Sequence, residues 1–309
     1  MTIYEDQKSQ RIPSNTLRGF KQDKVFDVVV ILLLLVAAIV TIYPLYFVLL
    51  ASISEPAALI GGRVFFWPVN PDLTAYKHIF NDARIWTGYG NTFTYTFFGT
   101  VVGLFLTIPG GYALSRKDLV GRNFFTKLMV FTMYFNGGLV PTYMVIKNLN
   151  MVNTRWVMII LGSFTVFNLI IVRTFFSSKI PDELFEAAQL DNCGNGQFFF
   201  RIVLPISKEI IAVMALYIAI AHWNSFFNAL IYLGTQKLFP LQLVLREILL
   251  GSQSIMGQDV DAAAMIEMQR LAETVKYGVM VVSTVPILLL YPFVQKYFVK
   301  GVMIGSVKG

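Results

Sequence analysis

Few residues in this chain could carry out catalysis. It has one cysteine, Cys193, and two histidines, His78 and His222. A single cysteine makes neither a disulfide framework nor a cysteine-based zinc site, and two histidines leave little for a metal centre. The sequence also has no G-x-x-x-x-G-K-[ST] phosphate loop and no acidic metal cluster. We therefore expect a protein that is not an enzyme, binds no cofactor or metal of its own and does not hydrolyse ATP.

Segment 177–208 indicates a mechanical role instead. Pro181 suits the first position of a helix, and the carboxylates of Asp182 and Glu183 complement the positive end of its dipole. Asn and Gly residues between 192 and 196 favour left-handed backbone and should end this helix. Four residues fall at helical spacing, with small side chains on part of the face: Leu184, Ala187, Ala188 and Asp191. A short helix of this kind, tied to apolar segments on both sides, is suited to dock in a groove and transmit movement.

The composition requires a membrane around these residues. Hydrophobic residues make up 56% of the chain and charged residues 14%, with a mean hydropathy of +0.63, whereas an average chain carries about 25% charged residues. Six stretches without Asp, Glu, Lys or Arg reach the roughly 17–25 residues that a membrane-crossing helix needs. The fourth extends past Arg173, whose side chain can snorkel to the interface. The prediction is an all-α membrane protein with a six-helix domain at 28–295 and spans at about 28–54, 85–115, 128–146, 156–176, 210–236 and 277–295.

The distribution of Lys and Arg sets the predicted orientation. Most of the 25 Lys and Arg residues fall in segment 1–27, in the connections after the second and fourth spans, and in the tail 296–309. Because positive residues favour the cytoplasmic side, both termini and the 177–208 connection are predicted to be cytoplasmic. Segment 1–27 has no small-residue cleavage site, so it is not interpreted as a cleavable signal. The net charge of +7 is explained by this topology and by attraction to the membrane surface, and no nucleic-acid partner is expected.

The cytoplasmic segment also carries a specific resemblance. Glu186-Ala187-Ala188, then Asp191, then Ile202-x-Leu204-Pro205 resemble the EAA loop of ABC-importer permease subunits. Asn192 stands where that family usually has Gly, and Asn can adopt the same positive φ at modest cost. The similarity covers most of the chain and is nearest to the carbohydrate branch, with its smaller maltose-permease subunit and its permeases for complex oligosaccharides. The other segments that carry it are Tyr43-Pro44-Leu45, Gly90-Asn91-Thr92, 135–143, 222–230 and 300–309.

The resemblance implies a type I ABC-importer permease fold in a bacterial cell membrane, together with a set of partners. These are a second, non-identical permease, two cytoplasmic ATPase subunits that bind ATP and Mg²⁺, an extracytoplasmic solute-binding protein and a carbohydrate substrate. The long outer loop at about 237–276 would face the solute-binding protein, and Lys308 and Gly309 in the tail would contact the ATPase. The implied ATPase-coupling loop includes Glu186, Ala187, Ala188, Asp191, Asn192, Gly196, Leu204 and Pro205.

The predicted fifth span contains candidates for the translocation path: His222, Trp223, Asn224 and Asn228. A turn of 3.6 residues would place Asn224 and Asn228 on one helix face, with Trp223 beside it. Amides and an aromatic ring suit a sugar, because they bond hydroxyl groups and stack on the less polar ring face. The alternative, which stays open, is that these side chains only bond helices to one another. His222 is expected to be a neutral, hydrogen-bonded histidine.

Other features of the spans and outer loops are expected to be structural. Gly99 and Gly103 have the G-x-x-x-G spacing that permits close approach of another helix. The residues Asn136-Gly137-Gly138 should break a helix or allow a close crossing. Short helices are predicted at 73–80 and 260–274 in the two long outer loops, which are either functional or passive tethers.

Three classes of function are compatible with these patterns. The first is an ABC-importer permease for an oligosaccharide, and the second is the same assembly with a peptide or a glycolipid-like cargo. The third is a self-sufficient carrier or a membrane enzyme, which would need ionisable residues within the spans. Only His222 is available there, so the sequence favours the ABC assembly.

Overall fold

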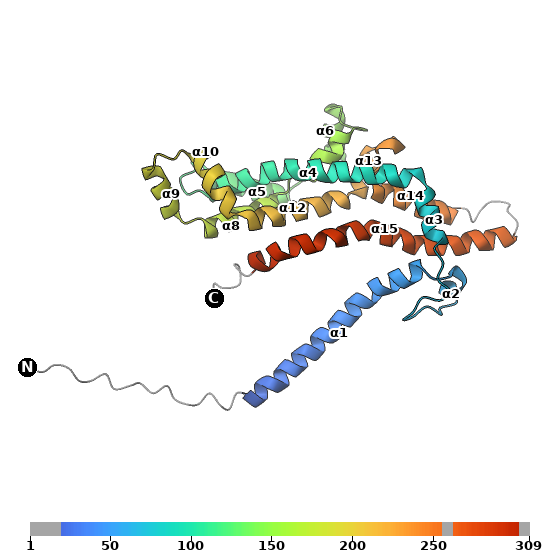
Figure 1. Cartoon of the computed structure of the whole chain (residues 1–309). Helices are drawn as coiled ribbons and strands as arrows, with labels where there is room; N and C mark the ends of the chain where they lie inside the picture. Colours follow the sequence, from blue (N-terminus) through green and yellow to red (C-terminus); the bar gives the residue numbers. More distant parts are fainter. Residues whose placement is uncertain (1–19, 255–261, 303–309) are drawn as a thin grey trace, which may run out of the picture.

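The computed structural model describes residues 20–254 and 262–302, and every element within them is a helix (Figure 1). Lys308 and Gly309 lie outside the described residues. The first half of the chain contains α1 (Phe20–Ser52), α2 (Pro56–Ile60), α3 (Thr74–Asn81), α4 (Ala83–Ser115), α5 (Arg122–Tyr134), α6 (Leu139–Asn148) and α7 (Arg155–Ile160). The second half contains α8 (Val166–Lys179), α9 (Asp182–Leu190), α10 (Asn195–Phe198), the π-helix η1 (Phe199–Val203), α11 (Leu204–Ile206), α12 (Lys208–Trp223), α13 (Phe226–Tyr232), the 3-10 helix η2 (Gln236–Leu238), α14 (Leu241–Ser254) and α15 (Ala262–Val302).

Three of these helices are long and apolar enough to cross a membrane. They contain the stretches Lys24–Ser52, Ala83–Ser115 and Arg270–Leu289. Two bent pairs qualify when each is taken as one broken span: α5 with α6, at 111°, and Asn195–Ile206 with α12, at 81°. Within the described residues the structure therefore has three continuous spans and up to five in total.

Three predicted spans are divided into shorter helices. In 128–146 the break falls at 135–138, where Gly138 has φ +80°, and in 156–176 it falls at 161–165, where Gly162 has φ +89°. The expectation of one helix through 210–236 is wrong, because α12 ends at Trp223 and α13 begins at Phe226. None of these breaks contains a charged residue, so charge-free stretches alone cannot reveal where the helices end.

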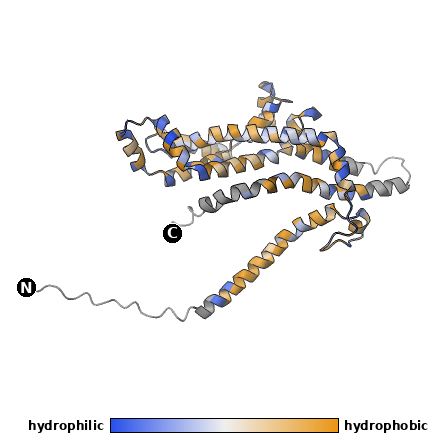
Figure 2. Cartoon of the chain, in the orientation of Figure 1, coloured by the Kyte–Doolittle hydropathy of each residue, from blue (hydrophilic) through white to orange (hydrophobic). Residues whose placement is uncertain are grey.

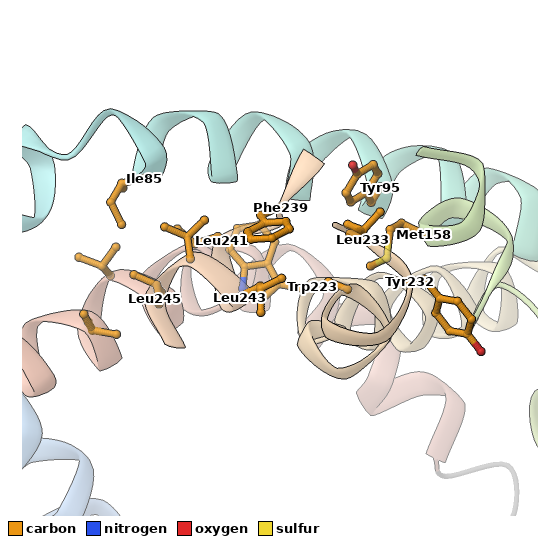
Figure 3. Packing of buried hydrophobic residues seen from close by; sticks show 14 of the residues in the cluster. Ile85, Tyr95, Met158, Trp223, Tyr232, Leu233, Phe239, Leu241, Leu243 and Leu245 are labelled. Atoms are coloured by element: carbon orange, nitrogen blue, oxygen red, sulfur yellow. The ribbon is translucent and has the colours of Figure 1, made fainter. Parts of the chain in front are cut away.

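The helices α4, α8, α12 and α15 form a bundle with distinct ends. In Figure 1, α4, α8 and α12 run side by side with α15 beneath them, while α9 and α10 close one end and α3 and α14 lie at the other. One buried cluster fills the α3–α14 end, where Trp223, Phe239 and Leu241 meet between α4 and the helices below it (Figure 3). A second cluster fills the α9 end, around Phe176 and Phe198.

The helix α1 lies apart from the bundle. It is apolar around nearly its whole circumference (Figure 2), and none of its most apolar 18-residue window is buried. Within the described residues, α1 makes its main helix–helix contact with α15. There the ring of Phe47 packs edge-on against the ring of Tyr277, with centroids 6.0 Å apart. Toward its C-terminal end, the hydroxyls of Tyr43 and Tyr46 donate to the carbonyls of Phe65 and Phe66 and hold that loop against the helix.

The outer loops differ in how well the sequence predicts them. The short helix predicted at 73–80 is confirmed as α3. The helix predicted at 260–274 is not separate, because α15 continues from Ala262 through the predicted sixth span. Pro286 and Pro292 lie inside α15 without ending it.

Candidate functional site

The site begins with the short cytoplasm-facing helix of the sequence prediction, α9. Pro181 is its N-cap, so the helix begins at Asp182, one residue later than predicted, and Asp182 and Glu183 occupy the first turn. The helix ends in a Schellman turn, in which Asn192 N–H donates to Gln189 O and Cys193 N–H donates to Ala188 O, both at 2.9 Å. Asn192 has φ +57°, the left-handed conformation expected of it from the sequence.

The inner face of α9 is anchored by two buried side chains, Phe185 and Ala188. The ring of Phe185 packs edge-on against Phe198 with centroids 5.2 Å apart, and the guanidinium carbon of Arg116 lies 3.5 Å from the Phe185 centroid. Both buried side chains belong to the cluster that joins α9 to the ends of α4, α8 and α12: Ile108, Val172, Phe176, Phe185, Ala188, Phe198, Phe199, Val203, Ile210 and Met214. Movement of α9 must therefore displace these helix ends, because the packed side chains between them cannot be compressed.

The opposite face of α9 is exposed in the part of the chain that the structure describes. Glu186 and Ala187 are exposed, and Leu190 is 89% exposed. A large apolar side chain this exposed, beside a small one at helical spacing, makes a surface on which another protein can seat. Of the two adjacent alanines, Ala187 is therefore exposed and Ala188 is buried.

A bent connection links α9 to α12. It passes through Gly196, the π-helix η1 and α11, which contains Leu204 and Pro205. A π-helix is rare and is found mostly at functional positions, and the lost i→i−4 bond at a proline adds a second weak point. The axis turns by 81° between Asn195–Ile206 and α12, so α9 is joined to α12 through a sharply bent connection.

The four residues proposed for the translocation path do not share a surface. His222 and Trp223 are buried, whereas Asn224 is exposed and Asn228 is half-buried. Trp223 Nε1 donates to Ser283 O at 3.1 Å, which ties α12 to α15. Asn224 Nδ2 donates to Ile220 O of its own helix at 3.0 Å. The prediction that Asn224 and Asn228 share one helix face is wrong, because the helix breaks at Asn224.

His222 occupies a close helix crossing. A Cβ on Gly99 would lie 2.3 Å from His222 Nε2, and a Cβ on Gly103 would lie 2.4 Å from the carbonyl oxygen of Ser163. The hydroxyl of Ser163 donates to Ile159 O, so it accepts from His222 Nε2 at 3.3 Å. The structural role expected for Gly99 and Gly103 is confirmed: both let α12 and the 161–165 break approach α4.

Sequence reasoning missed the polar residues by which α4 holds the loop before α14. Asn91 Nδ2 donates to Lys237 O and Phe239 O, at 2.8 and 3.0 Å. Tyr95 Oη donates to Leu238 O at 2.8 Å, and Thr92 Oγ1 accepts from Leu241 N–H at 2.8 Å. The signal was available, because polar side chains at positions 91, 92 and 95 of a predicted span must find partners inside the protein.

The described part of the chain contains no group of three or more His, Cys, Asp or Glu side chains that could hold a metal ion. Cys193 is a free thiol beside α9, and its Sγ lies 3.9 Å from Gly194 O.

Known proteins resemble this chain along almost its whole length, although no family model matches it. It is 39% identical over 298 residues to Protein LplC of Bacillus subtilis (strain 168), covering 96% of this chain and 99% of that protein. It is 36% identical over 288 residues to the polygalacturonan/rhamnogalacturonan transport system permease protein YtcP of the same organism, covering 93% and 100%. A chain in the crystal structure of a bacterial ABC transporter involved in the import of the acidic polysaccharide alginate matches with a TM-score of 0.77 and 35% identity, covering 90% of this chain and 98% of that one.

Proposed function

The chain belongs to the family of permease subunits of sugar ABC importers, and we propose that it forms one half of an alternating-access pathway with a second, non-identical permease. Two cytoplasmic ATPase subunits supply the energy by binding ATP and Mg²⁺, and an extracytoplasmic solute-binding protein delivers the cargo. The chain itself carries out no hydrolysis. It converts closure of the ATPase dimer into a change in which side of the membrane the pathway faces.

The two-sided packing of α9 is the observation that carries this proposal. Its exposed face, with Ala187 and Leu190, seats in a cleft on one ATPase subunit. Its buried face, with Phe185 and Ala188, passes the resulting motion to α4, α8 and α12. Asn192 and Gly196 allow the sharp reversal of the chain after α9, and Leu204 and Pro205 lie in the bent connection between α9 and α12. The tail, with Lys308 and Gly309, adds a second contact to the ATPase.

We place six spans in a bacterial cell membrane, with both termini cytoplasmic. The three continuous spans and the two bent pairs support five of them. The sixth is formed by α7 and α8 across the break at 161–165. This arrangement puts α9 on the cytoplasmic side and α3 and α14 on the outer side, at the end where the solute-binding protein docks.

The polar residues of the fifth span have divided roles in this proposal. His222 and Trp223 are buried and bind helices together, which is the packing alternative. Asn224 and Asn228 remain available to the pathway, because their side chains are not enclosed by this chain. Replacing each by Ala should lower transport at unchanged thermal stability. Normal transport by a complex that unfolds at a lower temperature would assign them to packing instead.

An oligosaccharide is the proposed cargo. Of the similar proteins, one is a polygalacturonan/rhamnogalacturonan transport system permease and another belongs to a transporter involved in alginate import, and these cargoes are carbohydrate polymers. A peptide or a glycolipid-like molecule is the alternative cargo. Calorimetric titration of the cognate solute-binding protein with galacturonan and alginate oligosaccharides, a neutral arabino-oligosaccharide and a peptide mixture would separate these classes.

The assembly is tested by purifying the chain from native membranes in mild detergent and identifying its companions by mass spectrometry. We expect a second permease and an ATPase, and ATP-dependent uptake of the cargo after reconstitution with the binding protein. Recovery of the chain alone or only as a homomer, under several mild conditions, would refute the proposed assembly.

A further inference from the structure

A basic cavity lies where α4, α5, α8 and α9 meet. Its volume is about 480 Å³, and its charged lining consists of four cations and two carboxylates: Arg116, Lys117, Arg122, Arg173, Asp182 and Glu183. The cavity lies at the end of the charge-free stretch of α4, which finishes at Ser115. This is the level at which a membrane-crossing helix meets the lipid headgroups.

Two of the four cations are already neutralised. Lys117 Nζ lies 2.6 Å from Asp182 Oδ2. Arg116 Nε lies 2.9 Å from Asp118 Oδ1, and this hydrogen bond holds the pKa of the Asp118 carboxyl below its usual value of 3.8. The Arg116 guanidinium is also stacked on Phe185. Each of these two cations is therefore paired with a carboxylate and offers little charge to a ligand.

The other two cations are not neutralised within the described residues. Neither Arg122 nor Arg173 has a carboxylate within 4.0 Å there. Arg173 Nε donates to Leu114 O at 3.2 Å, and its two terminal nitrogens make no hydrogen bond within the described residues. Two guanidinium groups facing one cavity present planar donor pairs that match the oxygens of a phosphate.

The cavity adjoins an apolar surface along α5. A second cavity of about 390 Å³ shares Lys117 and Arg122 with it and extends to Phe124. No side chain of α5 is buried, and Phe124 is 66% exposed. A ligand with a phosphate in the basic cavity could therefore lay an apolar chain along α5.

We propose that this cavity binds a phosphate group through Arg122 and Arg173. The phosphate belongs to an anionic phospholipid of the cytoplasmic leaflet or is a free phosphate ion, since both present the same oxygens. Glu183 in the lining opposes a second negative charge, so the single charge of a phosphodiester fits better than a dianion. The assignment to the cytoplasmic leaflet rests on the proposed topology, whereas phosphate binding in the cavity does not depend on transport.

The test uses the full chain with its co-purified partners, stripped of lipid in detergent and held in phosphate-free buffer. Native mass spectrometry measures binding of dioleoylphosphatidylglycerol and of dioleoylphosphatidylcholine. Arg122→Gln and Arg173→Gln are each expected to weaken phosphatidylglycerol binding by roughly tenfold or more. Lys127→Gln is the matched control, since Lys127 is an exposed cation on the same helix and does not line the cavity, and it should bind like the unmodified chain.

Competition identifies the source of the phosphate. If millimolar inorganic phosphate displaces phosphatidylglycerol, the site accepts the free ion. If it does not, the site is specific for lipid. Equal binding of phosphatidylcholine, an equal loss in Lys127→Gln, or unchanged binding in Arg122→Gln would overturn the proposal. Arg122→Gln decides the result if Arg173→Gln misfolds through loss of its bond to Leu114.

Discussion

Phe185 is the side chain that attaches α9 to the rest of the molecule, and Phe185→Ala should detach that helix without unfolding the protein. Only 7% of the residue is exposed, and truncating a buried Phe to Ala costs about 3–5 kcal/mol. That loss includes the edge-on contact with Phe198 and the stacked Arg116 guanidinium. Ala188, a single methyl group, is then the remaining buried anchor of a nine-residue helix, and a helix that short is marginal on its own.

A loss of about 3 kcal/mol changes a local opening equilibrium by roughly a hundredfold. Hydrogen exchange of residues 182–190 should therefore accelerate by about that factor, while exchange in α4 stays unchanged. In proteoliposomes, ATP should still be hydrolysed, because the ATPase subunits carry out hydrolysis and the substitution leaves the exposed residues Ala187 and Leu190 unchanged. More ATP should be consumed per cargo molecule moved, because the motion is no longer transmitted.

Phe200→Ala is the matched control. It removes the same ring from the neighbouring π-helix η1, where Phe200 is 68% exposed, so exchange and transport should both be unchanged. Unaltered exchange of residues 182–190 in Phe185→Ala, together with an unaltered ratio of ATP to cargo, would refute the attachment of α9 through this ring.

Three further predictions test other contacts. Ala187→Trp, on the exposed face of α9, should change the free energy of unfolding by no more than about 0.5 kcal/mol yet reduce co-purification of the ATPase, and full recovery of the ATPase would contradict the docking role. Gly99→Ala should lower the thermal midpoint, because its Cβ would collide with His222. Gly90→Ala is the control, because its Cβ meets nothing within 4 Å, and it should stabilise α4 by up to about 1 kcal/mol. Equal changes in the thermal midpoint of the two variants would disprove the close crossing. Asn224→Ala should leave the midpoint unchanged, because its amide bonds only its own helix, and a large drop in a thermal melt would show an unseen structural role.

The sequence was sufficient for the features that depend on composition. Charge-free stretches located α1, α4 and the apolar part of α15, because a charged side chain in a bilayer is costly enough to dominate the pattern. The turn after α9 was also predictable, since few residues other than Gly tolerate the left-handed backbone that Asn192 adopts.

Features that depend on tertiary contacts were not predictable. Gly162 and Asn224 interrupt helices without interrupting an apolar stretch, so nothing in a one-dimensional pattern distinguishes them from tolerated residues. Ala187 and Ala188 are neighbouring residues of the same type. Ala188 is buried and Ala187 is exposed only because Phe198 and the end of α4 lie on one side of the helix. The buried amide of Asn91 likewise acquires its role from the loop at 237–241, which is distant in the sequence.

The isolation of α1 has a consequence for how the protein is made. A ribosome delivers α1 to the membrane before any other helix, yet its principal helix partner, α15, is the last to emerge. During nearly all of synthesis α1 must persist in lipid as a solitary helix, and the mean hydropathy of 3.1 in its most apolar 18-residue window suits it for that period. Formation of the contact between Phe47 and Tyr277 then comes near the end of chain synthesis. Truncation of the chain before α15 should leave α1 inserted but unpaired, a state that membrane quality-control proteases could recognise.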